Sequence, residues 1–185
     1  MNKECTYSKC PGCGTSYLSK EYPADNRYGI MSQECRAAFD ELLAKESMDF
    51  GYPPAHRLVV DAYFAQHPPH IEIQKKLGIE KRFMDASVQS VVIHLIALYL
   101  AIEKKVELSS IAKHMAHVLN NINKNNTPFF LLEPPTTLGK VMIQNLICTT
   151  NIETYTQIAW QWANNVWDAW SIHHSYIKNI YENNK

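Results

Sequence analysis

An apolar stripe at helical spacing runs through residues 153–182 and limits the fold more than any other feature of the sequence. Side chains that recur every three or four positions lie on one face of an α-helix, and such a face must pack against other apolar surface. The stripe therefore predicts one long terminal helix inside a helical bundle. Its members are Tyr155, Ile158, Ala159, Trp162, Val166, Ala169, Trp170, His173 and Ile177.

Several other segments carry the same period, and none of useful length alternates as a strand does. The most apolar of them predicts a central, well-buried helix, but its core, Val91–Ile102, is too short to cross a bilayer. We therefore expect an all-α fold, a helical bundle of about five to six helices that forms a single domain over residues 1–185. The further helices are expected after Ser32, from about Pro53 to Gln66, from Asp85 to about Glu103, after Ser109 or Ser110, and over 138–147.

The first part of the chain, residues 1–30, carries no helical period but contains two cysteines three positions apart. They belong to the motif CPGCG at residues 10–14, in which proline and glycine favour a tight turn that directs both thiols to one point. This geometry suits one face of a tetrahedral metal site, and a cytosolic chain rarely keeps such a pair as a disulfide. Residues 1–30 are therefore predicted to be an irregular, zinc-knuckle-like segment packed on the helices.

A structural zinc site needs four protein ligands, and the sequence offers no second pair of cysteines at this spacing. Cys35 is the expected third ligand, because it opens the first helix, where the helix dipole favours a thiolate. His56 is the first choice for the fourth, since it lies at a helix start where the knuckle could dock. Zinc is thus the expected cofactor. The expected ligands are Cys10, Cys13, Cys35 and His56, with Cys5, His173 and His174 left open as alternatives for the fourth.

Three other interpretations of the cysteine pair stay open: a reduced turn without metal, a redox-active pair, and an iron–sulfur cluster that also uses Cys5. A thioredoxin-like pair follows a strand, and no strand pattern precedes Cys10. The chain has 5 cysteines, an odd number, which argues against a framework of disulfides. Cys148 follows an apolar stretch and is expected to be buried as a small packing residue.

Charge and motif content exclude several classes of function. The chain has 18 lysines and arginines and 18 aspartates and glutamates, so it shows no excess of basic residues, and we expect no nucleic-acid partner. Its N-terminus has no apolar signal region, and we expect a cytoplasmic protein with no membrane partner. No nucleotide-binding glycine loop, serine elbow or HExxH motif is present in the sequence.

The remaining polar residues define two hypotheses of function. In the first, the zinc is structural and the protein acts by binding an unknown protein or small-molecule partner. In the second, the protein is a metal-dependent hydrolase with a pocket lined by histidine and aspartate. Three thiolates would make a zinc-bound water a poor acid, which favours the first hypothesis, but whether the chain is an enzyme stays open. The acid–base candidates of the second are Asp61, His67, His173 and His174.

Six segments carry recognisable motifs, among them CPGCG, HRLxVDAYxxQHP, LEPP and WxxHH. They are Cys10–Gly14, Ser32–Cys35, His56–Pro68, Val91–Glu103, Leu132–Pro135 and Trp170–His174. In this order they resemble an uncharacterised bacterial family, a domain of unknown function, and 56–68 is the most specific part. The chain departs from the pattern around 70–81, where its linker looks longer. The resemblance implies that the polar residues form one constellation, and it supplies no activity.

Overall fold

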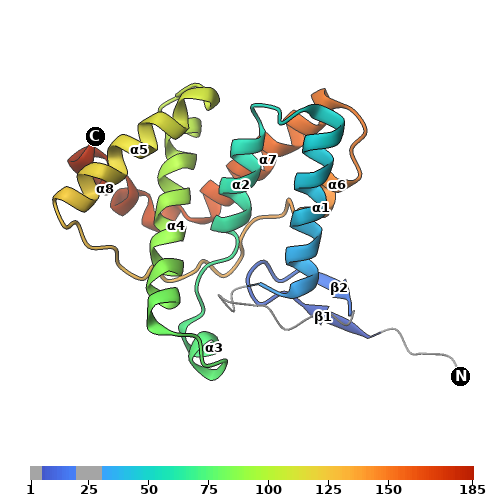
Figure 1. Cartoon of the computed structure of the whole chain (residues 1–185), viewed down its shortest axis with the longest axis horizontal. Helices are drawn as coiled ribbons and strands as arrows, with labels where there is room; N and C mark the ends of the chain where they lie inside the picture. The colour runs from blue at the N-terminus through green and yellow to red at the C-terminus, as the bar shows by residue number, and fades with distance from the viewer. Residues whose placement is uncertain (1–5, 20–30) are drawn as a thin grey trace, which may run out of the picture.

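The computed structural model describes residues 6–19 and 31–185, and in these residues helices make up almost all of the regular structure (Figure 1). This confirms the predicted all-α fold, although the described residues contain more helices than the expected number of about five to six. A two-stranded sheet lies near the N-terminus. The helices are α1 (Gln33–Phe50), α2 (His56–Ala65), α3 (Ile71–Lys76), α4 (Lys81–Ile102), α5 (Leu108–Lys124), α6 (Gln144–Ile147), α7 (Ile152–Ala169) and α8 (His174–Asn184).

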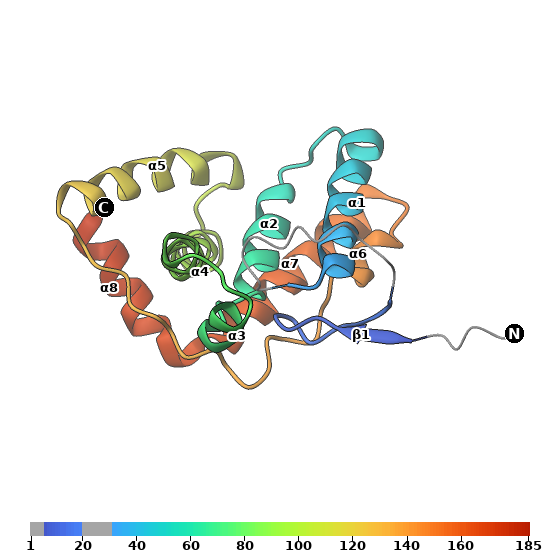
Figure 2. The same cartoon turned by 60° about the horizontal axis from the view of Figure 1, so that its bottom comes forward.

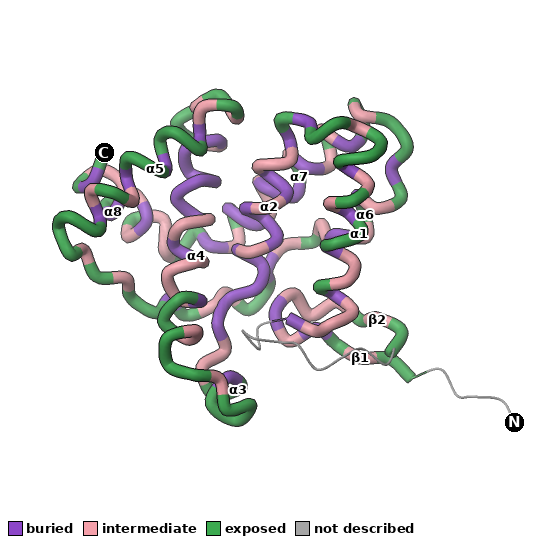
Figure 3. The backbone as a smooth tube through the Cα atoms, viewed as in Figure 1, coloured by how far each residue is buried: buried purple, intermediate pink, exposed green. Residues whose placement is uncertain are grey.

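Helices α2 and α4 form the centre of the molecule. α2 packs mainly against α4 and α7, while α4 also contacts α5 and α8. Figure 2 looks along α4 and shows these helices around it, and Figure 3 shows how much of α2 and of the second half of α4 is buried. Residues 95–101 of α4 are buried without interruption, as expected for the central helix. The core also includes the last three tryptophans of the chain, Trp162, Trp167 and Trp170.

Helix α4 is also the helix that length and composition alone would allow to cross a membrane. In the described part of the chain no other helix passes that test. Of its most apolar stretch, 56% is buried inside the bundle. This burial is the pattern of a core helix, so the apolar character of α4 is explained by the helices packed around it.

Helices α1 and α2 form an antiparallel hairpin whose two ends hold the polar groups discussed below. The side chain of Ser32 accepts a hydrogen bond of 3.1 Å from the backbone N–H of Cys35, so it caps the start of α1 as the sequence predicts. The helix ends at Gly51, whose φ of 61° is a left-handed conformation that glycine adopts without strain. α2 then runs back along α1, and the rings of Phe39 and Tyr63 stack between them at 3.9 Å.

The predicted long terminal helix is wrong in one respect, because the structure divides it into α7 and α8. A 3₁₀ turn over Ser171–His173 separates the two helices. Trp170 is fully buried there and donates from Nε1 to the backbone oxygen of Ala65 at 3.0 Å. Nε2 of His174 donates at 2.9 Å to the carbonyl oxygen of Trp167. In a continuous α-helix this oxygen would accept its hydrogen bond from the backbone N–H four residues later. The spacing pattern cannot show these side-chain contacts, because it fits a straight helix equally well.

The N-terminal segment forms a β-hairpin, β1 (Tyr7–Lys9) and β2 (Ser16–Leu18), around the turn of the CPGCG motif. The backbone N–H of Cys10 donates to the oxygen of Thr15 at 2.8 Å and closes the turn. Gly14 has a φ of 76°, which residues with a side chain rarely adopt. Each strand has 3 residues, too few for an alternating pattern, and this is why the sequence indicates an irregular segment here.

Two further expectations about cysteines have different outcomes. The predicted burial of Cys148 is wrong, because its side chain is exposed. α6 has 4 residues and buries Leu146 fully, and a position two residues further along a helix is turned by about 200° from it. Cys148 therefore faces away from the core. Cys5, one of the alternatives for a metal ligand, lies outside the described residues.

Candidate metal centre

Four side chains from separate parts of the chain converge where the β-hairpin meets the start of α1 and the end of α2. They are Cys10, Cys13, Cys35 and His67, and their donor atoms lie within 4.8 Å of one another. The Sγ atoms of Cys13 and Cys35 are 3.9 Å apart, and Sγ of Cys35 lies 3.2 Å from Nε2 of His67. Three of the four are buried, and Cys13 is half-buried. This group, called the CCCH cluster below, could hold a metal ion.

Backbone geometry positions the three thiols. The backbone N–H of Ser32 donates to Sγ of Cys10 at 3.4 Å, and Sγ of Cys13 lies 3.3 Å from Oγ1 of Thr15. Cys35 lies in the first turn of α1, where free N–H groups and the positive end of the helix dipole favour a negative sulfur. The structure thus brings together the three cysteines that the sequence analysis selected.

His67 joins the cluster from the chain just after α2. Its Nδ1 lies 2.6 Å from the backbone oxygen of Tyr63, so Nδ1 carries a proton, and Nε2 faces the sulfur atoms. The hydroxyl of Tyr63 donates to the backbone oxygen of Cys35 at 3.3 Å, and its ring lies 4.2 Å from the His67 ring. These contacts hold the histidine in the tautomer and the orientation that a metal ligand needs.

Comparison with known protein families gives a match over residues 8–171 to DUF5946, a family of unknown function. The matched range includes every member of the CCCH cluster. The chain belongs to DUF5946. The resemblance to an uncharacterised family is thereby confirmed, and the bacterial origin of the chain stays a prediction. Comparisons with curated proteins and with solved structures found no match.

His56, the first choice for the fourth ligand, lies at the other end of the hairpin in this DUF5946 protein. Its Nδ1 is 2.5 Å from Oε2 of Glu46, a fully buried carboxylate that also accepts a hydrogen bond from the hydroxyl of Tyr155. The reason is topological: α1 runs away from the β-hairpin and α2 returns toward it (Figure 1), and His67, just after α2, lies 3.2 Å from Cys35. His67 therefore occupies the place expected for His56. An antiparallel pairing of the two helices is the signal that identifies it.

The other acid–base candidates do not gather with His67 around one pocket. Asp61 belongs to a separate group between α2 and α4. His173 donates from Nε2 to the backbone oxygen of Glu133 at 2.8 Å. His174 stacks on Trp167 with 3.7 Å between ring centroids. In the part of the chain that the structure describes, the motif segments thus form several polar groups, and the single constellation implied by the resemblance is not present.

The side chains of the CCCH cluster shift one another's pKa values. Hydrogen bonds from the thiols of Cys13 and Cys35 lower the pKa of Cys10, and contacts with Cys10 and Cys13 raise the pKa of Cys35. Burial alone would lower the pKa of His67, but hydrogen bonds to Cys10 and Cys13 raise it to about 9. Three thiols in contact cannot all ionise without a cation. A divalent cation would displace the protons and hold the four groups together in their place.

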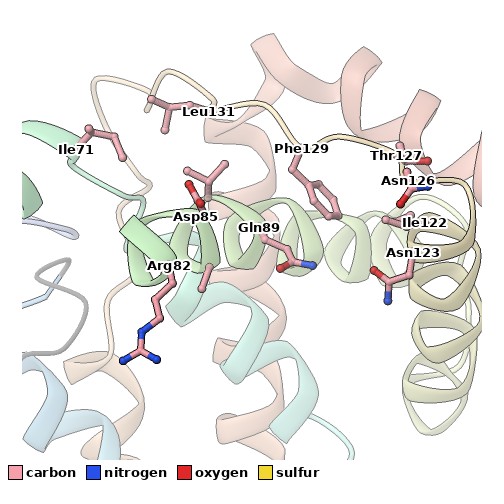
Figure 4. Close-up of a pocket in the computed structure, with 12 residues that line it drawn as sticks. Ile71, Arg82, Asp85, Gln89, Ile122, Asn123, Asn126, Thr127, Phe129 and Leu131 are labelled. Carbon is pink, nitrogen blue, oxygen red and sulfur yellow. The ribbon is translucent and has the colours of Figure 1, made fainter. Parts of the chain in front are cut away.

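A cleft of about 830 Å³ lies between α4 and the chain that follows α5 (Figure 4). Its lining combines the apolar side chains of Ile122 and Phe129 with the amides of Gln89, Asn123 and Asn126. Within residues 6–19 and 31–185, these three side-chain amides make no hydrogen bond. The volume is in the range of sites that bind small molecules or a few residues of a peptide.

Proposed function

We propose that the protein is a small helical binding protein that holds a structural zinc ion in the CCCH cluster. The distances between donor atoms carry this proposal. Around a tetrahedral zinc with bonds of about 2.0–2.3 Å, ligand atoms lie about 3.3–3.8 Å apart. The separations are 3.9 Å between the sulfurs of Cys13 and Cys35 and 3.2 Å from Cys35 to the ring of His67. Thiolate and imidazole donors also suit zinc better than they suit calcium or magnesium.

The number of donors supports a structural role for the ion. Four protein ligands complete the coordination of zinc, whereas a catalytic zinc keeps three and leaves a position for water. Burial of Cys10, Cys35 and His67 supports the same role, because a substrate would not reach the ion. The hypothesis of a metal-dependent hydrolase has less support, since its remaining candidates make their contacts elsewhere in the fold.

The ion would fasten the β-hairpin to α1 and α2. The hairpin has strands of 3 residues each, and a two-stranded sheet of this length is not stable alone in water. The core of α2, α4 and α7 is built from side chains outside the cluster, so removal of zinc is expected to release the hairpin and leave most helices in place. Reduced thiols also require a reducing compartment, which supports a cytoplasmic location.

Metal analysis of the purified, untagged protein tests this proposal. We expect one zinc ion per chain, and we expect Cys10→Ser to lose it. Cys148→Ser is the matched control, because Cys148 is exposed and lies outside the cluster, and it should retain the metal. The proposal is overturned if protein prepared without chelator contains no metal, or if Cys10→Ser keeps its zinc.

The cleft beside α4 is where we expect a partner to bind. Its unbonded amides can both donate and accept hydrogen bonds, and its apolar side chains can cover an apolar group of the ligand. This combination suits an extended peptide of a partner protein. Peptides selected by display on the intact protein should bind Asn123→Ala at least ~10-fold more weakly. Asn179→Ala is the matched control, because Asn179 is an exposed residue of α8 that does not line the cleft, and it should leave binding unchanged. Equal binding to both variants would show that the cleft is not the binding surface.

A further inference from the structure

A second buried group, which shares no residue with the CCCH cluster or the cleft, lies between α2 and α4. At its centre is Asp61, which is 1% exposed. Its Oδ1 accepts a hydrogen bond of 2.7 Å from Nδ1 of His94, and its Oδ2 accepts one of 2.8 Å from Nε of Arg57. The side chains of Arg57 and His94 are 29% and 16% exposed, so one buried carboxylate holds two side chains that reach the surface.

Burial distinguishes this group from an ordinary ion pair on a helix. Arg36 and Asp40 on α1 have the same spacing of four residues and also bond through Nε, but their side chains are 50% and 55% exposed. Such an exposed pair contributes little to stability. A carboxylate removed from water, in contrast, needs hydrogen bonds to both oxygens. Asp61 therefore holds Arg57 and His94 in fixed positions, which Asp40 does not do for Arg36.

Arg57 and His94 each keep hydrogen-bonding atoms that the fold does not use. Nδ1 of His94 donates to Asp61, so Nε2 is the acceptor of the ring whenever the ring carries a single proton. The ring stacks on Phe64, with 4.8 Å between centroids and 12° between planes, so its direction is set. Arg57 bonds through Nε and keeps two Nη groups as donors. Neither Nε2 nor the Nη groups bond to a residue in the described parts of the chain.

We propose that Arg57 and His94 bind a small oxyanion that carries a hydroxyl group, a chemistry shared by hydrogen phosphate and 2-hydroxycarboxylates. The Nη groups of Arg57 donate to the anionic oxygens. The hydroxyl of the ligand donates to Nε2 of His94. Asp61 does not touch the ligand and acts as a positioning residue for both. An oxyanion without a hydroxyl is rejected, because its lone pairs would face the lone pair of Nε2. The site does not depend on the bound metal or on a partner in the cleft.

Calorimetric titration of the full chain at about pH 8 tests the selectivity, because phosphate there retains one proton while sulfate retains none. Phosphate is compared with sulfate, and lactate with propanoate, which differs from lactate by the hydroxyl alone. We expect the ligand of each pair that has a hydroxyl to bind at least ~10-fold more tightly than its partner. Binding of phosphate without lactate would assign the site to phosphate, and the reverse would assign it to hydroxy acids. Equal binding within both pairs, or no saturable binding of phosphate and lactate, overturns the proposal.

Variants locate the binding in the structure. Arg57→Gln should weaken the binding of phosphate or lactate at least ~10-fold, while Arg36→Gln, which breaks the matched exposed pair, should leave it unchanged. His94→Gln retains a donor for Asp61 but lacks the ring, so it should lose the preference for phosphate over sulfate. If Arg57→Gln does not fold by circular dichroism, Arg57→Lys removes the guanidinium and keeps the charge. Unchanged binding in the folded Arg57 variant contradicts the assignment.

Discussion

The two ends of the α1–α2 hairpin hold histidines in opposite surroundings. At one end His67 faces the sulfur atoms of the CCCH cluster, and at the other His56 contacts the buried carboxylate of Glu46. The carboxylate end is complete in itself, because Glu46 accepts hydrogen bonds from both His56 and Tyr155. The sulfur end has only the ring of His67 to offset three thiols, which repel one another once they ionise. The chemistry of each end follows from the neighbours that the helix pairing gives to its histidine.

The largest effect should come from removing a donor at the sulfur end. Cys35→Ser is expected to lose the bound metal and to lower the free energy of unfolding by roughly 3–5 kcal/mol, because the ion stabilises only the folded chain. Urea denaturation together with metal analysis measures both quantities. Cys148→Ser should stay within about 0.5 kcal/mol of the native protein. A Cys35→Ser protein with native stability and native metal content would mean that the two ends do not differ in the way described.

The next largest effect should come from the carboxylate end. Glu46→Ala leaves Tyr155 without its buried acceptor and opens a cavity, so we expect a loss of about 2–4 kcal/mol in unfolding free energy. Metal content should not change, since Glu46 lies at the far end of the hairpin. Burial and the hydrogen bond to Glu46 raise the pKa of Tyr155, so its hydroxyl remains a donor at neutral pH. Loss of metal in Glu46→Ala would show that the ends are coupled.

Replacing each of the two histidines separately by glutamine gives the most direct test of the comparison between the two ends. His67→Gln should weaken zinc binding at least ~10-fold, because the lone pair of Nε2 is lost from the cluster. His56→Gln should retain full zinc binding and lose only about 1 kcal/mol of stability, since His56 is partly exposed. Competition with a chromogenic chelator measures the affinity. Equal loss of zinc in both variants would argue that His56 is the ligand in solution.

The smallest effect is expected in the dependence of stability on acidic pH. Carboxyl groups other than Glu46 contribute to this dependence, and the contribution of Glu182 must be measured separately. Hydrogen bonds from Lys185 and Lys104 lower the pKa of Glu182 from 4.5 to about 2. A lowered pKa contributes stability above pH 4.5 that is lost as the pH falls through about 2. Glu182→Gln should therefore show a slightly shallower loss of stability across this interval in urea titrations at a series of pH values. A pH dependence identical to that of the native chain would remove Glu182 as a contributor.

Local patterns were enough to predict most of the helices and the three cysteines of the site. Ser32 caps α1 and the stripe that begins at Cys35 continues the helix, and both are visible in a few consecutive residues. The thiols of Cys10 and Cys13 follow from the tight turn between them, and Cys35 follows from its place at a helix start. Each of these features depends on neighbours in the sequence, which is why spacing alone identifies it.

The remaining features depend on residues that are far apart in the chain. Glu46 is fully buried because Tyr155, 109 positions later, covers it and bonds to it. The choice between His56 and His67 depends on the direction in which α2 returns along α1. The division of the terminal helix depends on a carbonyl in α2 that the indole of Trp170 reaches. None of these partners can be identified from periodicity, because periodicity describes one helix at a time.

The order of the metal donors along the chain has a consequence for biosynthesis. All four donors of the CCCH cluster lie at or before His67, so they leave the ribosome before α7 and α8 have been made. The β-hairpin, α1 and α2 can then close around an ion while the apolar faces of α2 still await their partners. With zinc bound as proposed, metal supply during translation would therefore decide how many chains dock the β-hairpin on α1 and α2, while most helices form without it.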